Sequence, residues 1–232
     1  MNRPGLCCVP APARPLAPAR AAGRMERAVP DPASQNFAEL LESVSARSPT
    51  PGGGAVAAAV GALAAALGGM VVSFSVGRKS LAEHAESLDR AGSELARARA
   101  VLLELASEDA AAYAALSDVF KLDKKDPSRA ARLSSAAEGA ITPPLAVVAT
   151  CTNLLRLFES LCGMSNRNLR GDLAIAAVLA DAAVRAARWM VLVNLPLLAT
   201  AERRTRVLGE LERQVADSAR RAGAVERACQ GE

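Results

Sequence analysis

The segment AVAAAVGALAAALGGMVVSFSV at residues 55–76 decides the fold class, because it is long, apolar and without a single charged residue. Alanine is the strongest helix former and a poor strand former, so the segment predicts a helix. A helix that is apolar on every side must be covered on every side, as at the centre of a bundle or at a subunit interface. We therefore expect an all-α protein, a compact antiparallel bundle of about five to six helices that forms a homodimer or higher homo-oligomer through this helix.

The same segment is long enough to span a bilayer. Alanine and glycine gain little free energy on transfer to lipid, however, and no other segment makes a clean second span. The apolar stretch from Leu173 to Leu198 is interrupted by Asp181, Arg185 and Arg188. We therefore expect a core helix and no membrane association.

Further helices are predicted on both sides of this segment. A short helix with Ser34 as its N-cap precedes the break at 48–54, and no segment shows the alternation typical of strands. The later helices are expected at 81–120, 128–161 with a candidate kink at Pro143-Pro144, 172–193, and 201–224, the last being amphipathic and rich in Arg and Glu.

A leucine repeat runs along the helix expected at 81–120. Leu88, Leu95 and Leu102 are spaced by seven residues, Leu81 and Leu116 keep the same register, and such a seam faces other helices. Asp109 occupies this seam between Leu102 and Leu116, so a carboxylate is predicted at an inward position, unless the register drifts and carries it to the surface. A buried carboxylate must be paired, hydrogen-bonded or shifted in pKa, which makes Asp109 the main candidate for proton transfer.

The sequence PTPGGG at 49–54 lies directly before the apolar helix. Three glycines free the backbone there, and the first helical N–H groups lack partners, so Gly52, Gly53 and Gly54 can cradle an anion or the polar edge of a ligand. The alternative is a tight turn that lets helices pack closely, and spacing alone does not separate the two. The pattern is not that of a nucleotide-binding P-loop.

Several single residues have both a structural and a functional interpretation. Arg78 and Lys79 follow the apolar helix, where they either complement its dipole or meet an anionic substrate. Asp172 is a helix N-cap or a catalytic carboxylate, and Asn194 ties down a helix end or faces a ligand. His84 is the only histidine and is expected to be structural.

Composition excludes some classes of protein. Residues 1–24 hold four arginines and no acidic residue, which leaves 24 of the 28 basic residues to balance the 24 acidic ones, so nucleic-acid binding is not expected. Residues 1–33 contain seven of the thirteen prolines and are expected to be a disordered extension. The folded domain is expected at 34–232, and translation is expected to start at Met1 or Met25. Five cysteines without metal-site or disulfide spacing favour a reducing, cytoplasmic location and no metal.

Taken in order, these features resemble the formiminotetrahydrofolate cyclodeaminase and methenyltetrahydrofolate cyclohydrolase family. The resemblance covers most of 34–220 and rests on PTPGGGAVAA at 49–58, Gly77-Arg78-Lys79, Asp109 with Ala112-Tyr113, Pro144-Leu145, Asn166, Gly171-Asp172-Leu173 and Val193-Asn194-Leu195. Members commonly have serine where this chain has Ala55 and Gly171, and many have glycine where it has Ser165.

The resemblance implies a dimeric helical enzyme that acts on a tetrahydrofolate derivative and carries no prosthetic group. It implies a catalytic set of Asp109, Lys79 and Asp172, and a substrate-binding set of Gly52, Gly53, Gly54, Arg78, Asn166 and Asn194. Whether ammonia or water chemistry dominates stays open. Because of the departures at Ala55 and Gly171, a catalytically silent folate-binding or scaffold homo-oligomer is the alternative.

Overall fold

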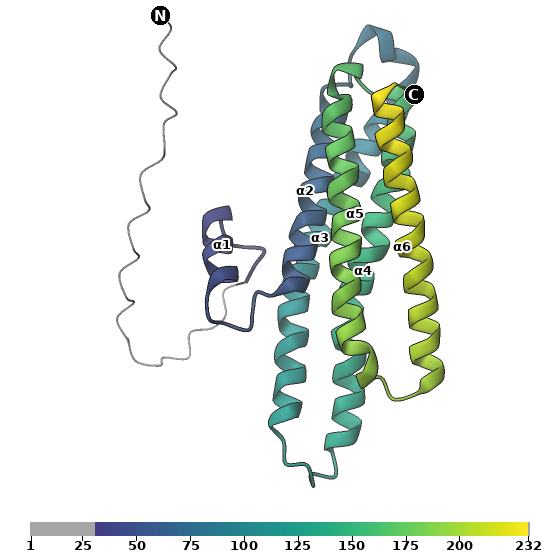
Figure 1. Cartoon of the computed structure of the whole chain (residues 1–232). Helices are drawn as coiled ribbons and strands as arrows, with labels where there is room; N and C mark the ends of the chain where they lie inside the picture. The colour runs from purple at the N-terminus through teal and green to yellow at the C-terminus, as the bar shows by residue number, and fades with distance from the viewer. Residues whose placement is uncertain (1–30, 232) are drawn as a thin grey trace, which may run out of the picture.

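A computed structural model describes residues 31–231, and six α-helices contain most of them (Figure 1). They are α1 (Phe37–Ser45), α2 (Gly53–Ser73), α3 (Ala85–Lys121), α4 (Arg129–Met164), α5 (Arg170–Asn194) and α6 (Ala201–Gln230), with short 3-10 helices at Lys79–His84, Arg167–Leu169 and Leu195–Leu197. No strand occurs in the range 31–231, so the all-α prediction is confirmed. The expectations for residues 1–30, including Cys7, Cys8 and the start at Met25, lie outside the described residues.

Helices α2, α3, α4 and α5 form an antiparallel four-helix square in which each helix packs on two neighbours (Figure 1). Helix α6 lies along α4 and α5 and covers the groove between them. Helices α3 and α4 are longer than α2 and α5, so their hairpin projects beyond the point where α2 begins. Because α2 does not reach between the projecting ends of α3 and α4, space for a cavity is left there.

The leucine seam lies inside the bundle as predicted. Leu88, Leu95 and Leu102 are almost fully buried on α3. Small residues on α2 let this seam and α4 approach closely: a Cβ on Gly68 would lie 2.5 Å from the Phe158 ring, which leaves room only for glycine. The alanine-rich composition thus sets a short distance between helices rather than a large buried area per residue.

Two helix starts differ from the prediction. Asn36, not Ser34, is the N-cap of α1, because Asn36 and Glu39 form a reciprocal capping box. Asp172 is not an N-cap either, since α5 begins at Arg170 and Asp172 falls within its first turn. Helix α4 continues through Pro143 and Pro144 to Met164.

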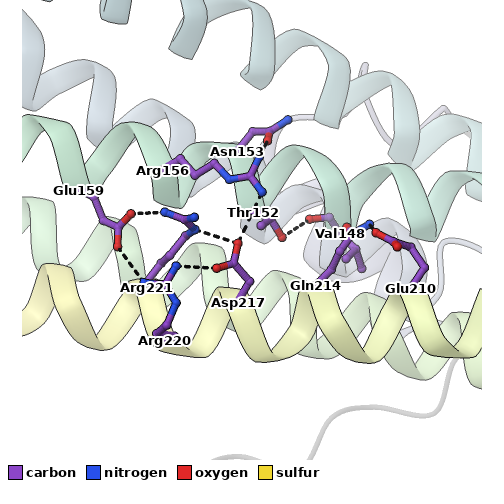
Figure 2. A network of polar contacts seen from close by, with 10 residues as sticks. All are labelled: Val148, Thr152, Asn153, Arg156, Glu159, Glu210, Gln214, Asp217, Arg220 and Arg221. Carbon is purple, nitrogen blue, oxygen red and sulfur yellow. Dashed lines mark hydrogen bonds and ion pairs between the residues drawn. The ribbon is translucent and has the colours of Figure 1, made fainter.

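The outer side of α4 and α6 is covered with paired charges (Figure 2). Arg221 of α6 donates to Glu159 of α4 and to Asp217 one turn earlier, at 2.8 Å from Nε to Oδ2. Asp217 also contacts Arg220 at 2.6 Å and Arg156 of α4 at 3.5 Å. We call Arg156, Glu159, Asp217, Arg220 and Arg221 the α4–α6 ion network.

The outer side of α2 is different. Its exposed side chains, Val56, Leu63, Ser73 and Phe74, carry no charge. Leu63 lines a cavity with Pro32 and with Phe37 and Leu40 of the segment that contains α1. Leu63, in the middle, is 49% exposed. Helices α2 and α4 are both long and apolar enough to cross a membrane by length and composition, so the prediction that only the first of these segments is a candidate span was wrong. About half of the most apolar window of each helix, 56% and 44%, is buried within the bundle.

Candidate active site

A cavity of about 460 Å³ lies where α2 begins, between the projecting α3–α4 hairpin and the end of α5. Its walls are mostly apolar, and its polar groups are Thr50, the backbone of Gly52 and Gly53, Asp109, Tyr113 and Asn194. Asp109 is the one charged side chain among the described residues that line it. An apolar cavity of this size with a few converging polar groups is typical of a small-molecule site.

Asp109 lies directly over the glycine-rich start of α2. The N-cap Gly52 has no side chain to bond the first helical N–H groups, and Asp109 accepts a hydrogen bond from the backbone of Ala55 instead. A Cβ on Gly54 would lie 2.0 Å from Oδ1 of Asp109, so this carboxylate occupies the space that any larger residue at 54 would fill. The glycines therefore allow a carboxylate of the same chain to approach the start of α2 closely. This combines the two interpretations of the sequence, a cradle for an anion and a turn that permits close helix packing.

The environment of Asp109 favours its protonated form. Burial beside the apolar walls raises the pKa of Asp109, and the hydrogen bond from Ala55 opposes that rise without cancelling it. A carboxyl group with a raised pKa in a cavity is a candidate for proton transfer. The inward position that the leucine repeat predicted for Asp109 is thus what the structure shows.

Asn194 connects the end of α5 to α4. Its Nδ2 donates to the carbonyl of Ala140 at 3.4 Å and to the carbonyl of Met190 at 3.0 Å. Pro144 has no N–H to offer the Ala140 carbonyl four residues earlier, so the Asn194 amide supplies that missing donor. This leaves the Oδ1 atom of Asn194 as the part of the amide that can accept from a ligand.

Arg78, Lys79 and Asn166 lie at the opposite end of the bundle. Helix α2 separates them from Asp109, and its 21 residues span about 30 Å. Arg78 and Asn166 line a second cavity of about 510 Å³, together with Arg167, Arg170 and His84. We call the first the Asp109 cavity and the second the arginine cavity. A single chain does not bring Lys79 to Asp109.

The remaining predicted residues at that end have local structural contacts. The backbone N–H of Asn166 donates to the buried hydroxyl of Ser75 at 2.8 Å, and its side chain accepts from the backbone of Asn168. These contacts hold the start of α5 against the end of α2. Lys79 is exposed and Asp172 is half-buried, and no cluster of three or more His, Cys, Asp or Glu side chains suited to a metal is found within residues 31–231.

Several residues that line the Asp109 cavity were not predicted as site residues, although Tyr113, Leu116 and Val193 belong to the motifs or the leucine repeat noted in the sequence. Tyr113, Leu116 and Phe120 line it from α3, and Met190 and Val193 line it from α5. The α3 residues follow Asp109 at intervals of four, seven and eleven, which places them on the same helix face. That spacing was the available signal; the α5 residues could be found only from the packing of two helices distant in sequence.

Several known proteins are similar to this chain in sequence. A family model described as Formiminotransferase-cyclodeaminase matches residues 36–213. A methenyltetrahydrofolate cyclohydrolase of Methylorubrum extorquens is 31% identical over 165 residues, which are 69% of this chain and 79% of that protein. The formimidoyltransferase-cyclodeaminase of Mus musculus is 34% identical over 160 residues, which are 67% of this chain and 30% of that longer protein.

The fold comparison agrees with the sequence comparison. The crystal structure of formiminotetrahydrofolate cyclodeaminase from Thermotoga maritima matches with a TM-score of 0.80 at 30% identity, covering 85% of this chain and 97% of that one. The family model spans well over half of this chain, so the resemblance noted in the sequence is confirmed.

Proposed function

We propose that this chain, which belongs to the formiminotransferase-cyclodeaminase family, is an enzyme that makes or breaks a C–N bond at the one-carbon unit of a tetrahydrofolate, with Asp109 as its proton-transfer group. Either a cyclodeaminase or a cyclohydrolase reaction fits this description, as the names of its relatives indicate. The formimido transfer named for the mouse relative belongs to a protein of which this chain matches only 30%, and it is not part of the proposal.

One observation carries the proposal: the carboxylate of Asp109 is held over the start of α2, at the wall of an apolar cavity, with a raised pKa. The reduced pterin of a tetrahydrofolate contains a planar pyrimidine ring with polar edges, and Tyr113 and Phe120 offer aromatic surfaces in this cavity. Backbone groups of Gly52 and Gly53 and the Asn194 oxygen can meet those edges. This arrangement supports a ring bound with its one-carbon unit near Asp109.

The two reactions make similar demands on Asp109. In the hydrolysis of 5,10-methenyltetrahydrofolate, water attacks the cationic carbon and Asp109 accepts one proton from that water. The bond to N5 then breaks as the new hydroxyl becomes the formyl carbonyl; Asp109 returns its proton to N5, and the hydroxyl proton is released to solvent. In the deamination of 5-formiminotetrahydrofolate, N10 attacks the formimino carbon, and Asp109 carries the N10 proton to the departing nitrogen. That nitrogen leaves as ammonia after taking a further proton from solvent. General acid–base groups of this kind contribute about 10²–10⁴-fold in rate.

The test is to incubate the full chain separately with 5,10-methenyltetrahydrofolate and with 5-formiminotetrahydrofolate. Loss of the methenyl near-ultraviolet absorbance above the rate without enzyme identifies a cyclohydrolase. Ammonia release with appearance of that absorbance identifies a cyclodeaminase. Saturable folate binding without either reaction would instead support a catalytically silent folate-binding protein, and the absence of both binding and turnover would contradict the proposal.

A further inference from the structure

Two cysteines from distant parts of the sequence meet at the end of the bundle that holds the arginine cavity. Cys162 lies in the last turn of α4, and Cys229 lies in the last turn of α6. The two helices run side by side in the same direction, so both last turns reach this end (Figure 1). The thiols of Cys162 and Cys229 are in hydrogen-bonding contact there, and both are free and half-buried.

Cys151, one helix segment earlier on α4, shows what a purely structural cysteine looks like in this fold. It is fully buried against α2, where a Cβ on Gly61 would lie 2.7 Å from its Sγ atom, and burial raises its pKa to about 12. Cys162 differs because it lines the arginine cavity of about 510 Å³. A small molecule in that cavity can therefore reach the Cys162 thiol, whereas the packed core excludes it from Cys151.

The surroundings of the two thiols give them different chemical roles. Burial and the neighbouring Cys229 thiol raise the pKa of Cys162 to about 11. Burial also raises the pKa of Cys229, but a hydrogen bond from Cys162 and the positive charge of Arg170 oppose that rise. Both effects stabilise a thiolate on Cys229. Since the thiolate is the nucleophile, Cys229 is the thiol that attacks first and Cys162 is the one that follows.

The end of α6 can supply the small movement that turns contact into a bond. A disulfide requires the two sulfur atoms to approach to about 2.05 Å. Cys162 is held on α4, where its Sγ atom lies 3.3 Å from the carbonyl oxygen of Phe158 in the core. Cys229, in contrast, is two residues before Gly231, which ends α6 in a left-handed conformation. Helix ends open at a lower free energy than the middle of a helix, so this last turn can adjust.

We propose that Cys162 and Cys229 are a redox modification site, which forms a reversible disulfide within one chain by exchange with a small-molecule disulfide and thereby fastens α6 to α4. The Cys229 thiolate attacks one sulfur of the small molecule, whose other half leaves as a thiolate. Cys162 then loses its proton and attacks Sγ of Cys229, which releases the second half. The protein loses two electrons and two protons, and the small-molecule disulfide gains them to become two thiols.

The bond would change how firmly α6 is attached. Between α4 and α6, the charged contacts of the α4–α6 ion network are partly exposed to solvent and are screened by salt. A covalent link near the ends of both helices closes a long loop that contains all of α5, which restricts the unfolded chain. In a reducing environment the pair stays open, so the stability of the bundle would follow the thiol–disulfide balance around it. This inference is independent of the proposed function.

Mass spectrometry of the full-length chain tests the bond directly. Cys7→Ser and Cys8→Ser are introduced so that the three described cysteines remain, and this parent chain is incubated with oxidised glutathione. Remaining free thiols are blocked with N-ethylmaleimide in denaturant, and the chain is digested with trypsin without a reductant. Peptides 157–167 and 228–232 should be joined by a disulfide within a covalent monomer, with Cys151 recovered as a blocked free thiol. Glutathione adducts without this link, a link found only in covalent dimers, or no oxidation of either cysteine would overturn the proposal.

Thermal melting with two matched variants tests what the bond does. Oxidation of the parent chain should raise the melting temperature by roughly 5–10 °C, and dithiothreitol should reverse the rise. Cys162→Ser and Cys229→Ser each remove one partner, so neither variant should show this rise, and Cys162→Ser should keep a glutathione adduct on Cys229 because no second thiol displaces it. A similar rise in either variant, or the 162–229 link without any rise in the parent chain, would contradict the proposal that the bond fastens α6 to α4.

Discussion

The α4–α6 side and the α2–α5 side of this bundle handle carboxylates in opposite ways. On the α4–α6 side, hydrogen bonds from Arg221 and Arg220 lower the pKa of Asp217 to about 2, and five charged residues form one network (Figure 2). At the end of the α2–α5 side, Asp109 has no cation among its described neighbours, and burial raises its pKa. Ion pairs thus favour the ionised form of Asp217, whereas burial disfavours the ionised form of Asp109.

The α4–α6 side has the character of a solvated surface, whereas the α2–α5 side has the character of a binding surface. A solvated helix face is completed by ion pairs that hold its residues in place at little cost. Exposed apolar side chains on α2 and a partly desolvated carboxylate at Asp109 both raise the free energy of an isolated chain. A bound ligand or a second copy would lower it. Substitutions on the two sides should therefore affect different properties.

The largest expected effect is that of Asp109→Asn. The amide keeps the shape and can still accept from Ala55, but it cannot transfer a proton, so turnover should fall by about 10²–10⁴-fold. Stability should stay unchanged or rise. Because the folded pKa of Asp109 is raised, its ionisation destabilises the fold as pH rises through that pKa, and this cost is absent at lower pH.

Turnover and thermal melting at several pH values check both parts of this prediction. The melting temperature of the Asp109→Asn protein should equal or exceed that of the native protein at neutral pH, and the difference should shrink in acid. Native turnover by this variant on its folate substrate would assign Asp109 a structural role and leave Asp172 as the better candidate.

A second substitution tests why glycine precedes this carboxylate. Gly54→Ala would place a Cβ at 2.0 Å from Oδ1 of Asp109 and force the side chain away. Displacement of a catalytic group by about 1 Å costs on the order of 100-fold in rate, so we expect a loss of that size. Gly69→Ala on the same helix is the control, because an added Cβ there meets nothing within 4 Å. The control should keep full turnover; equal losses in both variants would point to a general effect on α2.

Some parts of this site could be predicted from the sequence because they depend on a period within one helix. The leucine repeat predicted which face of α3 turns inward, and Asp109 lies on that face because it occupies the next position of the repeat. The start of α1 was predicted wrongly: Ser34 was named as its N-cap, whereas Asn36 forms a capping box with Glu39 two residues later.

Other parts depend on how distant helices meet. The donation from Asn194 to the carbonyl that Pro144 leaves unbonded requires α4 and α5 side by side. The separation of Arg78 and Lys79 from Asp109 depends on the length and direction of α2, although the motifs lie close together in the sequence. Order along the chain grouped these residues as one site, whereas the fold divides them between two ends.

A third prediction compares two exposed leucines, one on each side of the bundle. Leu63 on α2 is 49% exposed and Leu208 on α6 is 37% exposed. The sequence predicts self-association through α2, so Leu63→Glu would bury a carboxylate at that contact, and we expect the dimer dissociation constant to rise by about 100-fold. Leu208→Glu, facing solvent, should leave association unchanged. Analytical ultracentrifugation over a range of concentrations measures the association of both variants; equal behaviour of the two would mean that α2 does not form the contact between copies.

The smallest expected effect is that of Asp217→Asn in the α4–α6 ion network. The variant removes the acceptor shared by Arg156, Arg220 and Arg221. Solvent reaches the network and salt screens it, so the free energy of unfolding at neutral pH should fall by only about 1 kcal/mol or less, with turnover unchanged. Because the folded pKa of Asp217 is lowered to about 2, its stabilisation is present at neutral pH and is lost as pH falls from the ordinary carboxyl range through about 2. Urea unfolding at low and high salt, with Glu226→Gln on the same helix as the control, measures this. A loss of several kcal/mol, or a loss of turnover, would show that the α4–α6 side also supports the site, and the contrast between the two sides would fail.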